Sequence, residues 1–579
     1  NTLKYENTLN PYDQIKFEPS PLDRTDSQAA PGNSWAKGAG HEIEFEYETN
    51  TTSDNVRRFR VNLTLTGDAY FPALADDGYF AQGELTKNIT LDENHPGGTT
   101  KLHTMEEFKD KTDRTILKRT YALEGSTVTA HDTYFVYDDY ENLAVVLPPL
   151  MDASNASLSS LTGNIDALAY RYVYDRRNRL VEKQIPGKGK EYLVYNSMDQ
   201  PIMTQDALQR TRNEWLFTKY DAWGRVAYTG KVTNTDDRPA VQTSANGTSG
   251  NLWVERGPNQ GTSFAENIEI FYNNGAYPTA GITEILTINY YDDYGFTAAP
   301  LSQPQTAFGV TSDIRTKGLA TGTKVRVLDT GGVHWITTVN HYDQEGRPIY
   351  VHSYNDYLLT TDVTTTSLGF DGRVLTSRNQ HQRGSLTVVT LDNFTYDHTG
   401  RLLEQTQCIG NASLGETCAG SGAPTNLVLD GPTVTTDQTA TSSIVLSGTV
   451  TLSGTASLMV SPNAGNDAEL LVRNAYDELG QLEGKEVGGD AAGANALQTV
   501  DYSYNVRGWL TGINDANDTD NTLTRNNGDL FAFRIAYDEG PGALYNGNIA
   551  RTEWRTANTD TGLKGYDYTY DALNRIKTA

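Results

Sequence analysis

NFTYDHTGRLLEQT, residues 393–406, contains the pattern that decides the fold of this chain. Apolar and polar residues alternate up to Tyr396, which is typical of a half-buried β-strand. Asp397 can accept backbone hydrogen bonds and start a turn, and Gly400 supplies a residue with positive φ. An aliphatic residue then begins a return strand. The stretch predicts a β-hairpin whose tyrosine packs against a neighbouring unit, while Arg401 lies along a tyrosine or pairs with an acidic residue.

The same pattern, Tyr-[Asp/Asn]-x-x-[Gly/Asn]-x-[Leu/Val/Ile], recurs along the chain and indicates a repeat architecture. When looser copies are counted, most neighbouring copies lie about 20 to 35 residues apart, the range of stacked repeat units. Looser copies start at Tyr137, Tyr195 and Tyr342. We assign a structural, turn-forming role to these repeat residues: Tyr137, Asp138, Tyr174, Asp175, Tyr220, Asp221, Gly224, Arg225, Tyr342, Asp343, Tyr396, Asp397, Gly400, Arg401, Tyr476, Asp477, Gly480, Tyr504, Gly508, Tyr570, Asp571 and Arg575.

Composition excludes several classes of protein. The 579 residues carry a formal net charge of −26, which argues against a nucleic-acid partner because such proteins need a basic surface. No apolar run is long enough for a membrane-spanning helix. Many tyrosines and glycines favour strands and turns over helices. These features predict an all-β protein with no nucleic-acid partner and no transmembrane segment.

The two cysteines, Cys408 and Cys418, are ten positions apart. They are either two inert thiols or one disulfide that closes a loop in an oxidising compartment, and the sequence leaves both readings open. Metal ligation by this pair is less favoured, because no second Cys or His pair has a suitable spacing.

The repeats resemble those of the bacterial RHS or YD-repeat family, which also occur in the animal teneurins. The resemblance covers roughly residues 130–579, and longer stretches such as HDTYFVYDDYENLAVVLPP and VDYSYNVRGWLTGIND are similar to the branch found in type IX-secreting Gram-negative bacteria. Residues 1–130 are similar to the β-rich domain that precedes the repeats in that branch. The strict alternation of HEIEFEYE, residues 41–48, independently supports strands there.

The resemblance implies an all-β fold in which YD-repeat hairpins wind in a spiral and form a hollow shell. In related proteins such a shell encloses a C-terminal polymorphic toxin. The implied partner is therefore an enclosed passenger or toxin polypeptide, and the implied location is outside the cell or on the surface of a Gram-negative bacterium. We find no core motif for self-cleavage and expect any toxin activity to lie beyond Ala579.

Four segments follow from the spacing of the repeats. We predict an N-terminal β-rich domain (1–130), a first part of the repeat shell (131–410) with a loop-rich insertion near 230–280, a Ser/Thr/Gly-rich β insertion (411–467), and a second part of the shell (468–579). The insertion at 411–467 reads as a solvated cap on the wall, with a ligand-binding or adhesive module as the alternative.

No stretch carries a motif for catalysis, a cofactor or a metal ion. The histidines lack metal-ligand spacing, and the sequence contains neither a nucleophile elbow nor a Walker loop. The acidic run at 514–529 departs from the calcium-loop pattern. We therefore expect a non-enzymatic scaffold that needs no cofactor. The alternatives are a cell-surface adhesion protein that binds carbohydrate or protein, and an accessory protein bound to the outer-membrane secretion machinery.

Overall fold

The computed structural model describes residues 8, 10–247, 251–260, 264, 266–296, 304–328, 331–412, 414–418, 426–429, 433–434, 438–440, 443–446, 451–452, 458–460, 468–490, 496–515, 523–526, 528–540, 542–558 and 560–579. The chain divides into two compact units, one of residues 1–216, 233–249 and 501–579, and one of residues 217–232 and 250–500. The predicted division into four segments stays a prediction. The predicted all-β fold is confirmed, because antiparallel strands make up most of both units.

The first unit begins with a long antiparallel series of strands. The pairing runs β1–β2–β3–β6–β7–β8–β9–β10–β11–β12–β13–β14, and the hairpin β4–β5 joins this series where β5 pairs with β11. The strands are β1 (Gln14–Phe17), β2 (Thr25–Ala29), β3 (Ile43–Thr49), β4 (Arg57–Thr66), β5 (Ala69–Tyr79), β6 (Thr86–Leu91), β7 (Thr104–Lys109), β8 (Thr115–Glu124), β9 (Thr127–Tyr137), β10 (Leu143–Leu147), β11 (Tyr170–Asp175), β12 (Leu180–Ile185), β13 (Lys188–Tyr195), β14 (Pro201–Gln205) and β15 (Glu214–Tyr220), the last of which is divided between the units.

The same unit ends with a second run of hairpins from the C-terminal part of the chain. Strands β35 to β39 pair in order, and β40 pairs with β41. Their bounds are β35 (Gln498–Tyr504), β36 (Leu510–Ile513), β37 (Phe531–Ala536), β38 (Arg551–Thr556), β39 (Lys564–Asp567), β40 (Thr569–Tyr570) and β41 (Ile576–Thr578).

Helices in the described residues belong to the first unit and are short. They are η1 (Asn33–Trp35), η2 (Thr52–Asp54), η3 (Pro149–Met151), α1 (Leu158–Leu168), α2 (Ala207–Thr211) and α3 (Arg238–Gly247). The main core of this unit lies between β4–β5 and β8–β10, under α1. Phe108, Leu117, Val145 and Leu147 are completely buried there.

Within the segment predicted as a loop-rich insertion near 230–280, residues 238–247 form helix α3. Asp237 caps the helix by accepting a hydrogen bond from the backbone N–H of Ala240 at 3.0 Å. Val241 and Ala245 are buried on its inner side. The many Asn, Thr and Ser residues of this stretch suggested a loop, but burial of the apolar side chains against the sheet outweighs that weak local preference.

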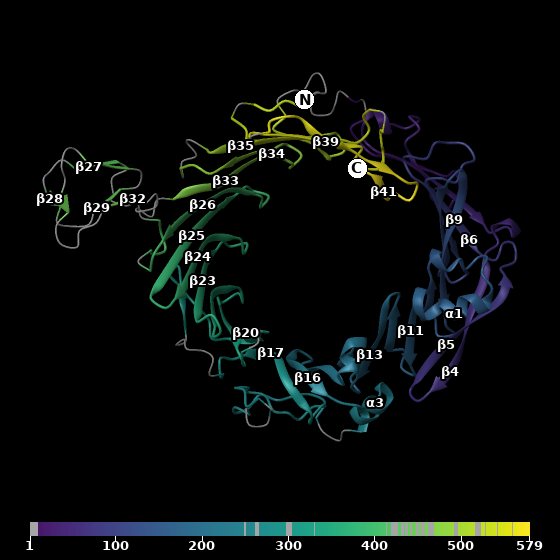
Figure 1. Cartoon of the computed structure of the whole chain (residues 1–579), viewed down its shortest axis with the longest axis horizontal. Coiled ribbons are helices and arrows are strands. Elements are labelled where there is room, and N and C mark those ends of the chain that lie inside the picture. Colours follow the sequence, from purple (N-terminus) through teal and green to yellow (C-terminus); the bar gives the residue numbers. More distant parts are fainter. Residues whose placement is uncertain are drawn as a thin grey trace. The chain divides into compact units, whose positions relative to one another are not determined.

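The second unit is a continuous antiparallel meander. The pairing runs β16–β17–β20–β21–β22–β23–β24–β25–β26–β33–β34, and β23 to β26 can be followed side by side in Figure 1. The strands are β16 (Val226–Thr233), β17 (Ile282–Asp292), β18 (Thr306–Ala307), β19 (Val310–Thr311), β20 (Thr316–Arg326), β21 (Trp335–Tyr342), β22 (Pro348–Asn355), β23 (Thr360–Leu368), β24 (Val374–Arg383), β25 (Leu386–Tyr396), β26 (Leu402–Gly410), β33 (Glu469–Tyr476) and β34 (Leu482–Val487).

Between β26 and β33 the backbone changes from antiparallel hairpins to parallel winding. Three ladders pair β27 with β30, β28 with β31 and β29 with β32, so each strand meets the one that follows it by 443 − 426 = 17, 451 − 433 = 18 or 458 − 438 = 20 residues. These strands, β27 (Asn426–Leu429), β28 (Thr433–Val434), β29 (Gln438–Ala440), β30 (Ser443–Leu446), β31 (Thr451–Leu452) and β32 (Leu458–Val460), lie within the segment predicted as a β insertion. The rest of 419–467 lies outside the described residues.

Candidate functional site

Each repeat turn is held together by one aspartate. In the turn of residues 397–401, Oδ1 of Asp397 accepts the backbone N–H groups of Thr399 and Arg401, both at 2.9 Å, and Oδ2 accepts Nε of Arg401 at 2.6 Å. Gly400 has a φ of 93°, which favours glycine at this position. Burial opposes the ionisation of Asp397, but these hydrogen bonds outweigh it and hold the pKa of the carboxyl below its usual value.

The same bonds occur at the other predicted turns. The aspartate or asparagine accepts the N–H groups two and four residues later at Asp138, Asp175, Asp221, Asp343, Asp477, Asn505 and Asp571. The fourth turn residue has positive φ at Gly224, Gly346, Gly480, Gly508, Asn178 and Asn574. The structure thus places the predicted aspartates and glycines in one common turn.

In eight of the described hairpins, a tyrosine ties the hairpin to the preceding one. The phenol O–H donates to a backbone carbonyl, usually that of the aliphatic residue that begins the previous return strand, at 2.5–3.1 Å. The donor and acceptor pairs are Tyr174 and Leu143, Tyr195 and Leu180, Tyr291 and Val226, Tyr342 and Ala320, Tyr396 and Val374, Tyr476 and Leu402, Tyr537 and Leu510, and Tyr570 and Ile549.

The arginine of a repeat contacts the next repeat. The guanidinium of Arg401 lies 4.6 Å from the ring centre of Tyr476, and that of Arg225 lies 4.3 Å from Tyr291. Arg373 donates to the carbonyl of Asp397 at 3.1 Å. The bidentate hydrogen bonds from Arg225 hold the pKa of Asp292 below its usual value. We call the combined Asp turn, Tyr hydrogen bond and Arg stacking the hairpin lock.

One further turn of this kind was not predicted. Asp110 accepts the backbone N–H groups of Thr112 and Arg114 and the Nε of Arg114, and the guanidinium lies 5.1 Å from the ring of Tyr137. Lys109 stands where a repeat has its tyrosine, so the full pattern did not match. The spacing of Asp110, Asp113 and Arg114 was the available signal, since Asp113 takes the positive φ of 63°.

Substituting the tyrosine of one lock tests its contribution. We expect Tyr396→Phe to destabilise the β24–β26 region by about 1 kcal/mol, because the hydrogen bond to the carbonyl of Val374 is lost while the ring stays. Amide hydrogen exchange in β24 and β25 would measure this as faster local opening. Tyr354→Phe, at a 38% exposed tyrosine of β22, is the matched control. Equal exchange in the two variants would contradict the role of the phenol.

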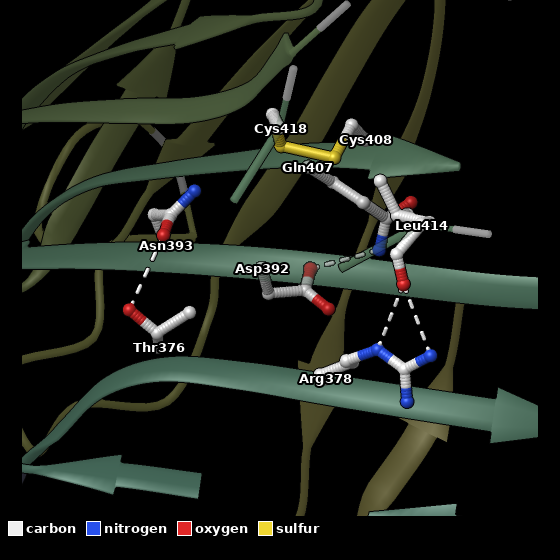
Figure 2. Close-up of a disulfide and its surroundings, with 8 residues drawn as sticks. All are labelled: Thr376, Arg378, Asp392, Asn393, Gln407, Cys408, Leu414 and Cys418. Atoms are coloured by element: carbon white, nitrogen blue, oxygen red, sulfur yellow. Dashed lines mark hydrogen bonds between the residues drawn. A yellow bond between two sulfur atoms is a disulfide. The ribbon is translucent and has the colours of Figure 1, made fainter. Parts of the chain in front are cut away.

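Cys408 and Cys418 form a disulfide in this structure. The bridge (Figure 2) fastens residues 414–418 over one face of β24–β26. Val389 and Leu391 are completely buried on that face. Arg378 donates from Nε and Nη2 to the carbonyl of Leu414 at 3.1 and 3.0 Å (Figure 2). A second cover comes from the β18–β19 hairpin, whose Phe308 N–H donates to Glu416 at 2.7 Å. The two loops together seal this apolar face.

A buried histidine lies on the same face of the second unit. His341 of β21 is fully buried between the ring of Tyr294, stacked at 4.8 Å, and the ring of Tyr350, edge-on at 5.6 Å. Neither ring nitrogen has a hydrogen-bond partner among the described residues. Burial, together with the nearby His352, lowers the pKa of His341 to about 4. The ring is therefore neutral at physiological pH.

Lys219 is a second buried titratable group, and it bears on the question of catalysis. Burial lowers its pKa to about 7, a value at which an amine can act as a nucleophile. Its Nζ donates to Oδ1 of Asn274, and the rings of Phe217 and Tyr228 lie 5.6 and 5.3 Å away. The residue is 1% exposed, so the described residues around it shield this amine from solvent.

Two further findings concern metals and membranes. In the described ranges, no group of three or more His, Cys, Asp or Glu side chains could hold a metal ion. Across the same residues, no helix combines the length and apolar character needed to cross a membrane.

Comparison with known proteins gives a family match over a small part of the chain. Residues 1–49 match the model of a family described as a domain of unknown function, DUF6443. No curated protein matches the sequence.

Solved structures resemble the chain only distantly. The crystal structure of TcdB2-TccC3 matches with 11% identity and a TM-score of 0.31, covering 97% of this chain and 23% of that one. The same complex without its hypervariable C-terminal region matches with 11% identity and a TM-score of 0.30, covering 98% and 26%. The chain thus spans about a quarter of the length of these chains. Such low similarity does not indicate a shared activity.

Proposed function

We propose that this chain is an RHS-type scaffold, secreted or displayed at the cell surface, whose wall of β-hairpins encloses or presents a polypeptide passenger. The hairpin lock carries this proposal. The Asp turn recurs in both units, and in several repeats a phenol hydrogen bond and an arginine contact fasten one hairpin to its neighbour. A device of this kind suits a continuous wall better than a reaction centre.

The chemistry of the lock supports a passive role. Its aspartates are occupied by backbone N–H groups and arginine, so they are not available as general acids or bases. The net charge of −26 would keep the wall soluble and away from anionic membranes and nucleic acids. We infer a non-enzymatic protein without a cofactor, and place any toxin activity in the passenger.

A second candidate function is adhesion or docking of an outer-membrane partner. It is favoured by the hairpin tips of the second unit on the side opposite the Asp turns. There Leu328, Leu358, Leu359 and Leu386 are 76%, 48%, 65% and 75% exposed. These tips join β20 to β21, β22 to β23 and β24 to β25, so they recur every second strand along the same edge of the sheet.

Electron cryo-microscopy of the protein purified from its native source separates the two functions. We expect polypeptide density that this chain does not account for on the inner side of a closed wall, with mass spectrometry identifying the passenger. An empty or open ribbon with another protein bound along the leucine-bearing tips would overturn enclosure and favour the docking role.

A further inference from the structure

The N-terminal segment of the first unit packs on hairpins from the other end of the sequence. Trp35 of η1 is 2% exposed and donates its indole N–H to the carbonyl of Tyr545 at 2.7 Å, across 510 positions of sequence. Its ring meets Trp509 edge-on at 5.7 Å and Tyr545 at 6.1 Å. Ser34 donates to Asp538 at 2.9 Å.

A partly buried cation lies at the centre of this junction. The guanidinium of Arg507 is 4.9 Å from the ring of Trp35 and 4.2 Å from that of Trp509. It donates to the carbonyl of Tyr545 at 3.1 Å and lies 3.5 Å from the carboxylate of Glu93, which is itself buried. Burial lowers the pKa of Arg507, and Glu93 opposes this shift. Glu93 is the carboxylate that pairs with this charge, and Asp13 and Asp538 add a weaker attraction.

Two more residues of the N-terminal part complete the contact. The ring of His41 stacks on Tyr545 with 3.3 Å between ring centres, and its Nδ1 is 2.9 Å from the carbonyl oxygen of Glu93. The side-chain oxygen of Asn94 accepts the backbone N–H of Tyr545 at 2.7 Å. Tyr545 is thus held from both sides by residues far from it in sequence.

The junction depends on a close approach at Gly32. A Cβ atom at this position would lie 2.8 Å from Cε3 of Trp35 and 3.0 Å from Cγ1 of Val506. The φ of 111° is also unfavourable for other residues. The backbone before η1 is therefore fitted closely to the side chains of the late hairpins.

The way in which the two parts are joined differs from the rest of the unit. Elsewhere neighbouring strands share ladders of backbone hydrogen bonds, whereas in the described residues β1–β3 and β35–β39 share no ladder. This junction is made by contacts between side chains and by hydrogen bonds from side chains to backbone groups. Such a contact can separate and re-form without breaking a sheet, which a hydrogen-bonded strand pair cannot do.

We propose that residues 32–42, together with Glu93 and Asn94, form a releasable clasp that holds the described residues of the 505–548 hairpins, and that opening of the clasp is the route by which the wall admits or releases its passenger. The clasp itself rests on the contacts above, and its role as a gate rests on the proposed function. Residues 32–42 lie in the second half of the segment 1–49, which matches the family of unknown function, so the clasp would be one role of that segment.

Hydrogen exchange on the full chain tests the clasp directly. We expect Glu93→Gln, which leaves Arg507 buried without its counter-charge, and Trp35→Ala to speed exchange in β36 to β38 by about tenfold or more. Exchange in β22 to β25 of the second unit should stay unchanged, which shows that the variants are folded. Glu84→Gln, which removes the exposed pair with Arg58, is the matched control for charge. Unchanged exchange in β36 to β38 would overturn the clasp.

A second measurement separates the gate from the proposed scaffold. In the native complex, the time for a protease to degrade the passenger is compared between the wild type and Glu93→Gln. Faster degradation in the variant supports the gate. Equal, slow degradation in both, with faster exchange in the variant, overturns the gate but leaves enclosure standing. Rapid degradation of the passenger in the wild type overturns enclosure and therefore also the gate. The clasp is then tested by hydrogen exchange alone.

Discussion

Gly230→Ala is expected to destabilise the second unit by about 3 kcal/mol, at the upper end of the range for overpacked sites. Gly230 is a buried residue of β16, opposite Ile285 of β17 at an irregularity in the ladder. A Cβ atom there would lie 2.2 Å from the carbonyl oxygen of Glu284 and 2.7 Å from two ring atoms of Phe217.

Moving either the Glu284 carbonyl or the Phe217 ring away from the added Cβ would cost free energy. The oxygen of Glu284 belongs to the backbone of the paired strand, so relief requires β17 to shift. The ring of Phe217 is 1% exposed and packs edge-on against Tyr228 at 6.1 Å between ring centres. Small-to-large changes are tolerated where the neighbour is a flexible side-chain end, which is not the case here.

Chemical denaturation monitored by fluorescence and by exchange in β16 and β17 measures the effect. Gly257→Ala is the matched control, because an added Cβ there meets no atom within 4 Å and the backbone angle is ordinary. If both variants unfold at the same denaturant concentration, the close approach seen at Gly230 is not a real constraint on the fold.

The hairpin could be predicted from the sequence because its determinants are local. The aspartate, the residue with positive φ and the arginine of a lock lie within five consecutive positions, as in Asp397, Gly400 and Arg401. Alternation before Tyr396 then identifies the strand. The turn at Asp110 escaped because Lys109, Asp113 and Thr115 stand where the pattern requires a tyrosine, a Gly or Asn, and an aliphatic residue. The bonds themselves, rather than the tyrosine, define the turn.

The remaining features depend on contacts between residues far apart in sequence. Nothing near Trp35 indicates that its indole meets Tyr545, and nothing near Gly230 shows that Phe217 closes over it. Helix α3 forms because Val241 and Ala245 find a buried surface, which composition cannot reveal. The pairing of Cys408 with Cys418 required knowledge of how the loop between them folds back.

Acidification is expected to loosen the second unit through His341. The folded-state pKa is about 4 and the ordinary value is 6.5, so the unfolded chain takes up a proton more readily than the folded one. Stability is therefore complete above pH 6.5 and falls as the pH drops from 6.5 towards 4. The full shift corresponds to about 3 kcal/mol, which is the expected loss of stability once the pH reaches about 4.

The surroundings of the ring explain the direction of this effect. Tyr294, Tyr350 and His352 are the titratable groups placed against it, and none of them can neutralise an imidazolium. His352 is itself buried, and its pKa is lowered for the same reason, so it adds to the slope. Protonation would place a cation between two aromatic rings beneath a sealed face. The free-energy cost of this buried charge, rather than the loss of a hydrogen bond, lowers the stability of the second unit at acid pH.

His341→Phe tests the assignment, because a neutral ring can occupy the space between Tyr294 and Tyr350 without a proton to gain. Exchange in β21 and β22 is followed from pH 7.5 to 4.5, after correction for the intrinsic pH dependence of exchange. The wild type should open more easily as the pH falls, and the variant should show a clearly shallower dependence, with the remainder due to His352. His381→Phe, at an exposed histidine of β24 that pairs with Asp362, should keep the wild-type slope. The role of His341 is contradicted if His341→Phe also keeps that slope, because the acid sensitivity would then arise elsewhere in the unit.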